Sequence, residues 1–77
     1  MIPFAKEINT VLVGLNEQNV TDTHLLNDSK DIPNMEGYTN DLLFVNLKCG
    51  RSIVYRYNTI RKQFDLWQGA SFMMQER

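Results

Sequence analysis

Apolar residues near the start of the chain recur every three or four positions, which places them on one side of a helix. The spacing predicts an amphipathic helix over Phe4 to Leu15 that ends within residues 16–19. Gly14 falls inside this helix and weakens it by about 1 kcal/mol relative to alanine. We interpret Gly14 as a tolerated residue, with close approach of another backbone as the alternative. The apolar stripe consists of Phe4, Ile8, Val11, Leu12 and Leu15.

From Asp41 onward the pattern changes to a period of two, the period of a strand with one buried face. A two-residue loop at Gly50 and Arg51 mixes the apolar and polar faces of the two strands that it joins. A loop with an odd number of residues, centred on Gly50, aligns the apolar faces, and this consistency sets the register of a half-buried sheet. The pairs expected from it are Leu47 with Ile53, Val45 with Tyr55 and Leu43 with Tyr57. The opposite face then carries Phe44, Asn46, Lys48, Val54 and Arg56.

The segment after Tyr57 fits two patterns. Phe64 and Leu66 alternate with a polar residue, which predicts a third strand after a turn over residues 58–62. A helix over Thr59 to Gln68 is the alternative, since Ile60, Phe64 and Trp67 have helical spacing. We favour the strand, because a three-stranded meander is more stable than an isolated hairpin.

Residues 20–41 form a polar and acidic connection between the helix and the sheet. Thr21 is a suitable N-cap and Asp22 favours a helix N-terminus, so the segment is compatible with a short second helix. Residues 27–38 have the composition of turns, and we expect residues 34–37 to lead the chain into the sheet. The expected fold is α+β: an N-terminal amphipathic helix, with or without the short second helix, packed on a three-stranded antiparallel sheet.

The length of 77 residues predicts a single small domain over residues 1–77, with a stability of about 3–5 kcal/mol. Cys49 is the sole cysteine, so no internal disulfide is expected. Lys6 and Glu7 interrupt the first apolar residues, and we expect neither a signal peptide nor a membrane span. The expected location is the cytoplasm, or the host cytoplasm if the protein is viral. A homo-oligomer is one way to enlarge so small a core.

Charge is distributed unevenly along the chain, although the formal net charge is only −1. Residues 1–41 carry two basic and seven acidic side chains, whereas residues 42–77 carry six basic and two acidic ones. Five of the basic side chains fall within residues 48–62, where no acidic residue occurs and Tyr55 and Tyr57 lie between them. Such asymmetry points to a charged partner.

Catalytic and metal-binding chemistry has little support in the sequence. His24 is the sole histidine, and no serine or cysteine stands in a recognisable catalytic context, so we expect no enzyme. One cysteine and one histidine do not supply a common structural zinc site, and the aspartates near residue 28 lack the glycine and glutamate of a calcium loop. No glycine-rich phosphate-binding motif is present, and we expect no cofactor.

Two functions from different classes remain. The first is a non-enzymatic regulator or inhibitor that binds another protein with an acidic surface, a type common among small phage and mobile-element products. The second is a nucleic-acid-binding domain that uses the basic hairpin 48–62, in which arginines contact phosphates and tyrosines stack on bases. The first is favoured because the register turns both tyrosines into the core and because half of the chain is acidic. The expected partner-binding residues are Lys48, Arg51, Arg56, Arg61, Lys62, Trp67, Phe72 and Met73.

Overall fold

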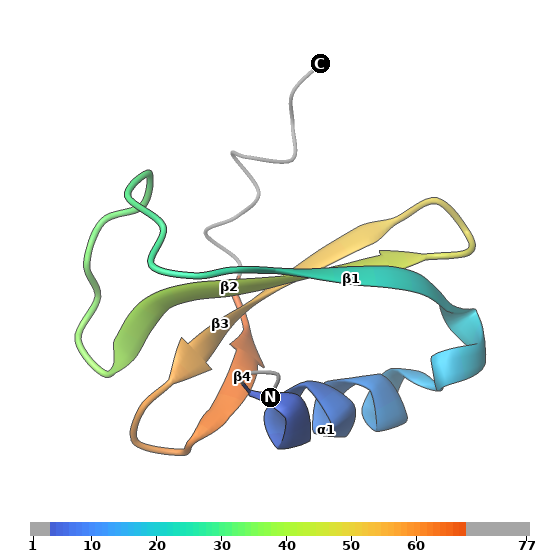
Figure 1. The fold of residues 1–77 in the computed structure, drawn as a ribbon, viewed down its shortest axis with the longest axis horizontal. Coiled ribbons are helices and arrows are strands. Elements are labelled where there is room, and N and C mark those ends of the chain that lie inside the picture. The colour runs from blue at the N-terminus through green and yellow to red at the C-terminus, as the bar shows by residue number, and fades with distance from the viewer. Residues whose placement is uncertain (1–3, 68–77) are drawn as a thin grey trace.

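A helix covers one face of a four-stranded antiparallel sheet in the computed structural model, which describes residues 4–67 (Figure 1). The sheet order is β1-β2-β3-β4, so each strand lies beside its neighbour in the chain. This architecture confirms the α+β fold, with four strands in place of three. Within the described residues no helix has the length and apolar character that a membrane crossing requires. The elements are α1 (Ala5–Leu15), the 3-10 helix η1 (Glu17–Asn19), β1 (Val20–Leu26), β2 (Tyr38–Leu47), β3 (Ser52–Asn58) and β4 (Gln63–Leu66).

The apolar stripe of α1 packs on the sheet, as the spacing predicted. Its Val11 joins buried residues of β2 and β4 in one hydrophobic cluster. The ring of Phe4, at the start of the helix, lies 4.6 Å from the ring of Tyr57 and 5.3 Å from that of Phe64, distances typical of aromatic pairs. The helix ends at Leu15, and the φ of 73° at the following residue, Asn16, turns the chain out of the helical conformation. The buried members of this cluster are Val11, Leu43, Val45 and Phe64.

The hairpin of β2 and β3 has a three-residue loop, Lys48 to Gly50. The amide of Leu47 donates to the carbonyl of Arg51 at 2.8 Å, and the amide of Gly50 donates to the carbonyl of Leu47 at 3.0 Å. Gly50 has a φ of 98° and occupies the left-handed position at the end of the loop, which glycine favours. The predicted odd loop is therefore confirmed, and it brings the apolar faces of the two strands together.

The predicted residue pairs in this hairpin are wrong by two positions. Val45 lies opposite Ile53, and Leu43 lies opposite Tyr55. The loop is centred on Cys49 because Gly50 serves at its left-handed end and not at its middle. Since the shift is an even number of residues, every side chain remains on its expected face.

Residues 20–26 form strand β1, so the short second helix expected there is absent from the described structure. β1 pairs with β2 from Val20 opposite Leu47 to Leu26 opposite Leu42. A bulge at Thr21 shifts the register near the start of the strand, and the hydroxyl of Thr21 donates to the carbonyl of Asn46 at 3.0 Å. β4 confirms the third strand of the predicted meander and excludes the alternative helix over residues 59–68.

The face of the sheet away from α1, called the outer face below, is also covered. Ile32, in the long connection between β1 and β2, is 6% exposed and packs against Leu42 and Val54. Trp67, which follows β4, packs on the same cluster. The sheet therefore lies between two hydrophobic clusters.

Candidate functional site

The basic residues of segment 48–62 are divided between the two ends of the hairpin. Lys48 and Arg51 are exposed beside the β2–β3 loop, and Arg61 and Lys62 are exposed in the β3–β4 turn. Figure 1 shows the two turns at opposite ends of the sheet. The seven residues of β3 separate them by about 20 Å. The structure does not gather these side chains into one positive surface.

Arg56 is buried, and the expectation that it is exposed on the outer face is wrong. Its side chain is 0% exposed, although it does project from the outer face. Its Nε donates to the carbonyl of Thr39 at 2.8 Å, and its Nη2 donates to the carbonyl of Pro33 and to Oδ1 of Asn40, both at 2.9 Å. The guanidinium carbon lies 5.0 Å from the ring centroid of Trp67, within reach of a cation–π interaction.

The covered position of Arg56 removes it from any binding surface of the folded protein. Burial lowers the pKa of its guanidinium, and the charge of Tyr38 acts in the opposite direction. An arginine nevertheless stays protonated at neutral pH. Arg56 is thus a buried cation that joins β3 to the start of β2 and to the connection before it. Trp67, expected at a partner surface, is half-buried over it, while Phe72 and Met73 lie outside the described residues.

The β3–β4 turn, residues 59–62, presents the most exposed large apolar side chain of the described residues. Ile60 is 79% exposed, and Met35 in the neighbouring connection is 43% exposed. A Cβ built on Gly37 would lie 3.6 Å from Cδ1 of Ile60, which places Ile60 beside that connection. Arg61 and Lys62 follow directly. We call Met35, Ile60, Arg61 and Lys62 the Ile60 surface.

Hydrogen bonds fix the turn that carries the Ile60 surface. Oδ1 of Asn58, a residue only 8% exposed, accepts from the amides of Ile60 and Arg61, both at 2.9 Å. The amide and hydroxyl of Thr59 donate to the carbonyl of Gly37 at 2.9 and 3.2 Å. These four bonds hold Ile60 outward without support from its own side chain.

Asp65 on β4 belongs to the same hydrogen-bond network as Asn58. Its carboxylate accepts from Nε2 of Gln63 at 3.0 Å, from Nδ2 of Asn58 at 2.9 Å and from the hydroxyl of Tyr38 at 3.4 Å. The Gln63 bond is the main cause that lowers the pKa of Asp65; the Asn58 bond, the charge of Arg61 and the Tyr38 bond also lower it, while burial raises it. The carboxylate orients Asn58, which in turn holds the turn.

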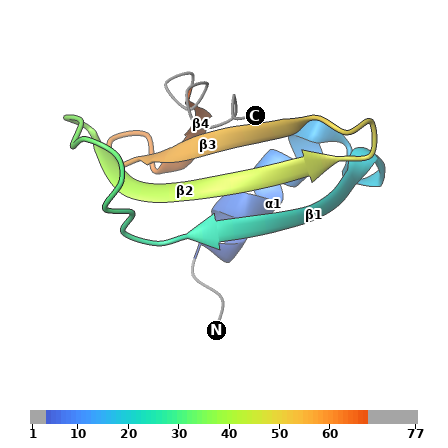
Figure 2. The same ribbon diagram turned by 90° about the horizontal axis from the view of Figure 1, so that it is seen from above.

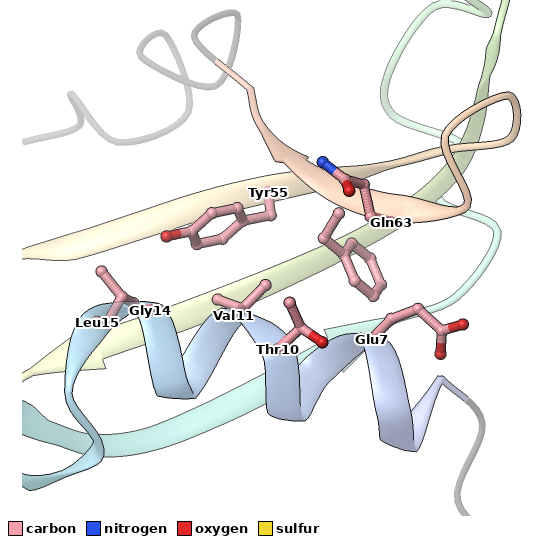
Figure 3. Close-up of a pocket in the computed structure, with 8 residues that line it drawn as sticks. Glu7, Thr10, Val11, Gly14, Leu15, Tyr55 and Gln63 are labelled. Carbon is pink, nitrogen blue, oxygen red and sulfur yellow. The ribbon is translucent and has the colours of Figure 1, made fainter.

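A groove of about 330 Å³ runs between α1 and the strands β3 and β4 (Figure 3). β4 pairs only with Tyr55–Asn58, so it leaves the groove open above Val11. Burial raises the pKa of the Tyr55 phenol, which therefore stays neutral. A smaller hollow continues along Glu7 and Thr10 to Lys6 and Lys62, so the groove extends toward the Ile60 surface. Its full lining is Glu7, Thr10, Val11, Gly14, Leu15, Tyr55, Gln63 and Phe64.

The described residues contain no group of three histidine, cysteine or acidic side chains that could hold a metal ion. His24 lies on β1, whereas Cys49 is exposed in the β2–β3 loop. The run of basic residues in segment 48–62 led to Arg61 and Lys62 as candidates, and Ile60 and Asn58 of the same segment were not among the expected binding residues. The sequence did contain a signal for this surface, because Ile60 is an isolated apolar residue inside a polar turn.

No protein-family model matches the chain, and searches of curated proteins and of solved structures found no match either.

Proposed function

We propose that this protein is a non-enzymatic regulator or inhibitor that binds another protein through the Ile60 surface. The observation that carries the proposal is the 79% exposed Ile60 on a turn that four hydrogen bonds hold in place. A turn whose backbone is already fixed before binding loses less conformational entropy when its apolar side chain enters a pocket. Interface hot spots lie in well-packed pockets from which water is excluded.

The cations beside Ile60 support a partner with an acidic surface. Arg61 and Lys62 are exposed, and Lys6 lies with Lys62 along the smaller hollow. We infer that acidic groups of the partner surround the apolar pocket that receives Ile60. Complementary charges of this kind raise the rate of association and the specificity more than the affinity.

The same geometry gives less support to nucleic-acid binding. Base stacking would need exposed aromatic faces, whereas Tyr55 and Tyr57 pack in the cluster beneath α1. Phosphate contacts would need a continuous row of cations, whereas Arg56 is buried between the two exposed pairs.

Quantitative capture from an extract of the source organism tests the proposal. We expect Ile60→Asp to reduce recovery of a stoichiometric partner tenfold or more, as loss of a hot spot does. Val13→Asp is the matched control, because Val13 on α1 is 65% exposed and lies outside the Ile60 surface. Equal recovery by the two variants would refute the role of Ile60.

Two charge reversals of equal size test the role of the cations. Arg61→Glu with Lys62→Glu should weaken binding of the captured partner about tenfold, whereas Lys48→Glu with Arg51→Glu at the other end of the hairpin should leave it within about twofold. Both pairs are exposed, so neither change disturbs the core. Equal weakening by both pairs, together with a steep salt dependence, would favour nucleic acid and overturn the proposal.

A further inference from the structure

β1 forms an open edge of the sheet. It pairs with β2 on one side, and no described strand pairs with it on the other. Figure 2 shows β1 on the outside of the sheet, at the edge away from β4. Thr21 to His24 are all exposed. An unpaired edge of this length offers its backbone groups to another strand.

The register shows which residues of β1 offer those groups. Backbone bonds alternate between the two sides of a strand, and the amide of Leu47 is directed toward β3. The alternate residues of β2, Leu42, Phe44 and Asn46, are therefore directed toward β1. They lie opposite Leu26, His24 and Asp22. The intervening residues of β1, Thr23 and Leu25, must direct their amides and carbonyls outward.

We propose that a second copy of the chain pairs with this edge, in an antiparallel arrangement centred on Thr23. In that register Thr23 faces Thr23 of the second copy as a hydrogen-bonded pair, and Asp22 faces His24 of the second copy. The Asp–His pair occurs twice by symmetry, as an interface that uses the same surface on both subunits requires. It falls at a non-hydrogen-bonded position, where the Cα atoms are only about 4.5 Å apart.

Charge selects this register over its neighbours. A shift of the centre to Asp22 places two aspartates opposite each other, and a shift to His24 places two histidines opposite each other. Two aspartates at directly opposed positions repel each other, and in both shifted registers the imidazole N–H of His24 loses the carboxylate that would accept from it. Of these three registers, the one centred on Thr23 is the only one that places Asp22 and His24 opposite each other.

Contacts within the chain already orient the two side chains. Nδ2 of Asn46 donates to Oδ1 of Asp22 at 2.7 Å, and the ring of His24 lies 6.3 Å from the ring of Phe44 at 45°. Both side chains project from the outer face. Their neighbours on β2, Asn46 and Phe44, carry no charge, so neither forms an ion pair with Asp22 or His24 that would compete with the second copy.

The molar mass in solution tests the proposal. Sedimentation equilibrium from about 1 μM to about 1 mM should show the 9.0 kDa chain reach twice that mass. At neutral pH His24→Lys should lower the dimer dissociation constant about tenfold and His24→Glu should raise it about tenfold, since each dimer contains the pair twice. A monomer throughout this range, or a dimer unaffected by these two changes, overturns the proposal.

A backbone variant provides an independent readout. Thr23→Pro removes an outward N–H, so it should abolish the dimer while the edge strand tolerates it. Thr23→Ala keeps the N–H and should dimerise like the original chain. If the proline variant loses its circular dichroism signal, the His24 variants decide the result alone. Ile60→Asp lies at the opposite end of the sheet order and should leave the mass unchanged, which separates this proposal from the proposed function.

Discussion

At the scale of single residues, the buried Arg56 is the feature that departs most from what the sequence indicates. Arginine is almost never fully buried unless its donors are satisfied. Here two backbone carbonyls and one amide oxygen accept from Nε and Nη2 of the guanidinium, while its buried Nη1 has no hydrogen-bond partner among the described residues. The alternation of residues 53–57 indicates that the outer face is exposed to solvent. The sequence of the strand itself contains no signal that the β1–β2 connection covers this face.

Arg56→Met should lower the free energy of unfolding by about 3 kcal/mol or more, because it removes the donor to three part-buried acceptors. A loss of this size approaches the whole stability of so small a domain. Urea denaturation followed by Trp67 fluorescence measures it. Arg51→Met removes an exposed arginine and should change stability by no more than about 0.5 kcal/mol. Similar midpoints for the two variants would contradict the structural role of Arg56.

Asp65 makes stability depend on pH. Its folded-state pKa is lowered, chiefly by the hydrogen bond from Gln63, so the folded protein binds fewer protons than the unfolded chain near the ordinary value of 3.8. The stabilisation is complete above that value and is lost as the pH falls through the lower folded pKa. Acid titration of the unfolding free energy should show a smaller loss below pH 3.8 in Asp65→Asn. An unchanged slope would show that other carboxylates cause the acid response.

At the scale of elements, α1 and the hairpin followed from periodicity, whereas β1 did not. Thr21 and Asp22 suit a helix N-terminus, but Val20, Thr21 and Thr23 are also β-branched residues that favour strands. Pairing with β2 decided between the two, and single-segment propensity contains no information about that pairing. The run Leu42 to Val45 did hold a usable signal, because four consecutive apolar residues indicate a strand that is covered on both faces.

Gly14, near the end of α1, can be replaced to test whether the fold requires a glycine at this position. Nothing lies within 4 Å of a Cβ built there, which agrees with a tolerated residue and not with close approach of another backbone. Gly14→Ala should raise the free energy of unfolding by about 0.5–1 kcal/mol, since alanine loses less backbone entropy. Thermal denaturation measures the change. Gly50→Ala has the opposite expected sign, because its φ is 98°. If Gly14→Ala were destabilised instead, the fold would require the absence of a side chain at this position in the groove.

At the scale of the whole molecule, the sheet has two covered faces and two exposed ends. Segment 48–62 looked like one basic surface in the sequence, and the fold converts it into two separate pairs of cations with a buried arginine between them. Arg61 and Lys62 could be named from the sequence because they belong to a run of basic residues. Their separation from Lys48 and Arg51 could not be predicted from the charge pattern, because it depends on the direction of β3 between the two turns.

Arg56 also has a consequence for how the chain chooses between alternative pairings. Sliding β3 along β2 by two residues preserves the inside-outside pattern of every side chain, so burial of apolar groups distinguishes such arrangements poorly. The same slide would carry the guanidinium away from Thr39, Pro33 and Asn40. A single cation thus fixes the register of the hairpin, because its hydrogen bonds to the start of β2 and to the preceding connection form in only one of the pairings that hydrophobicity alone would accept.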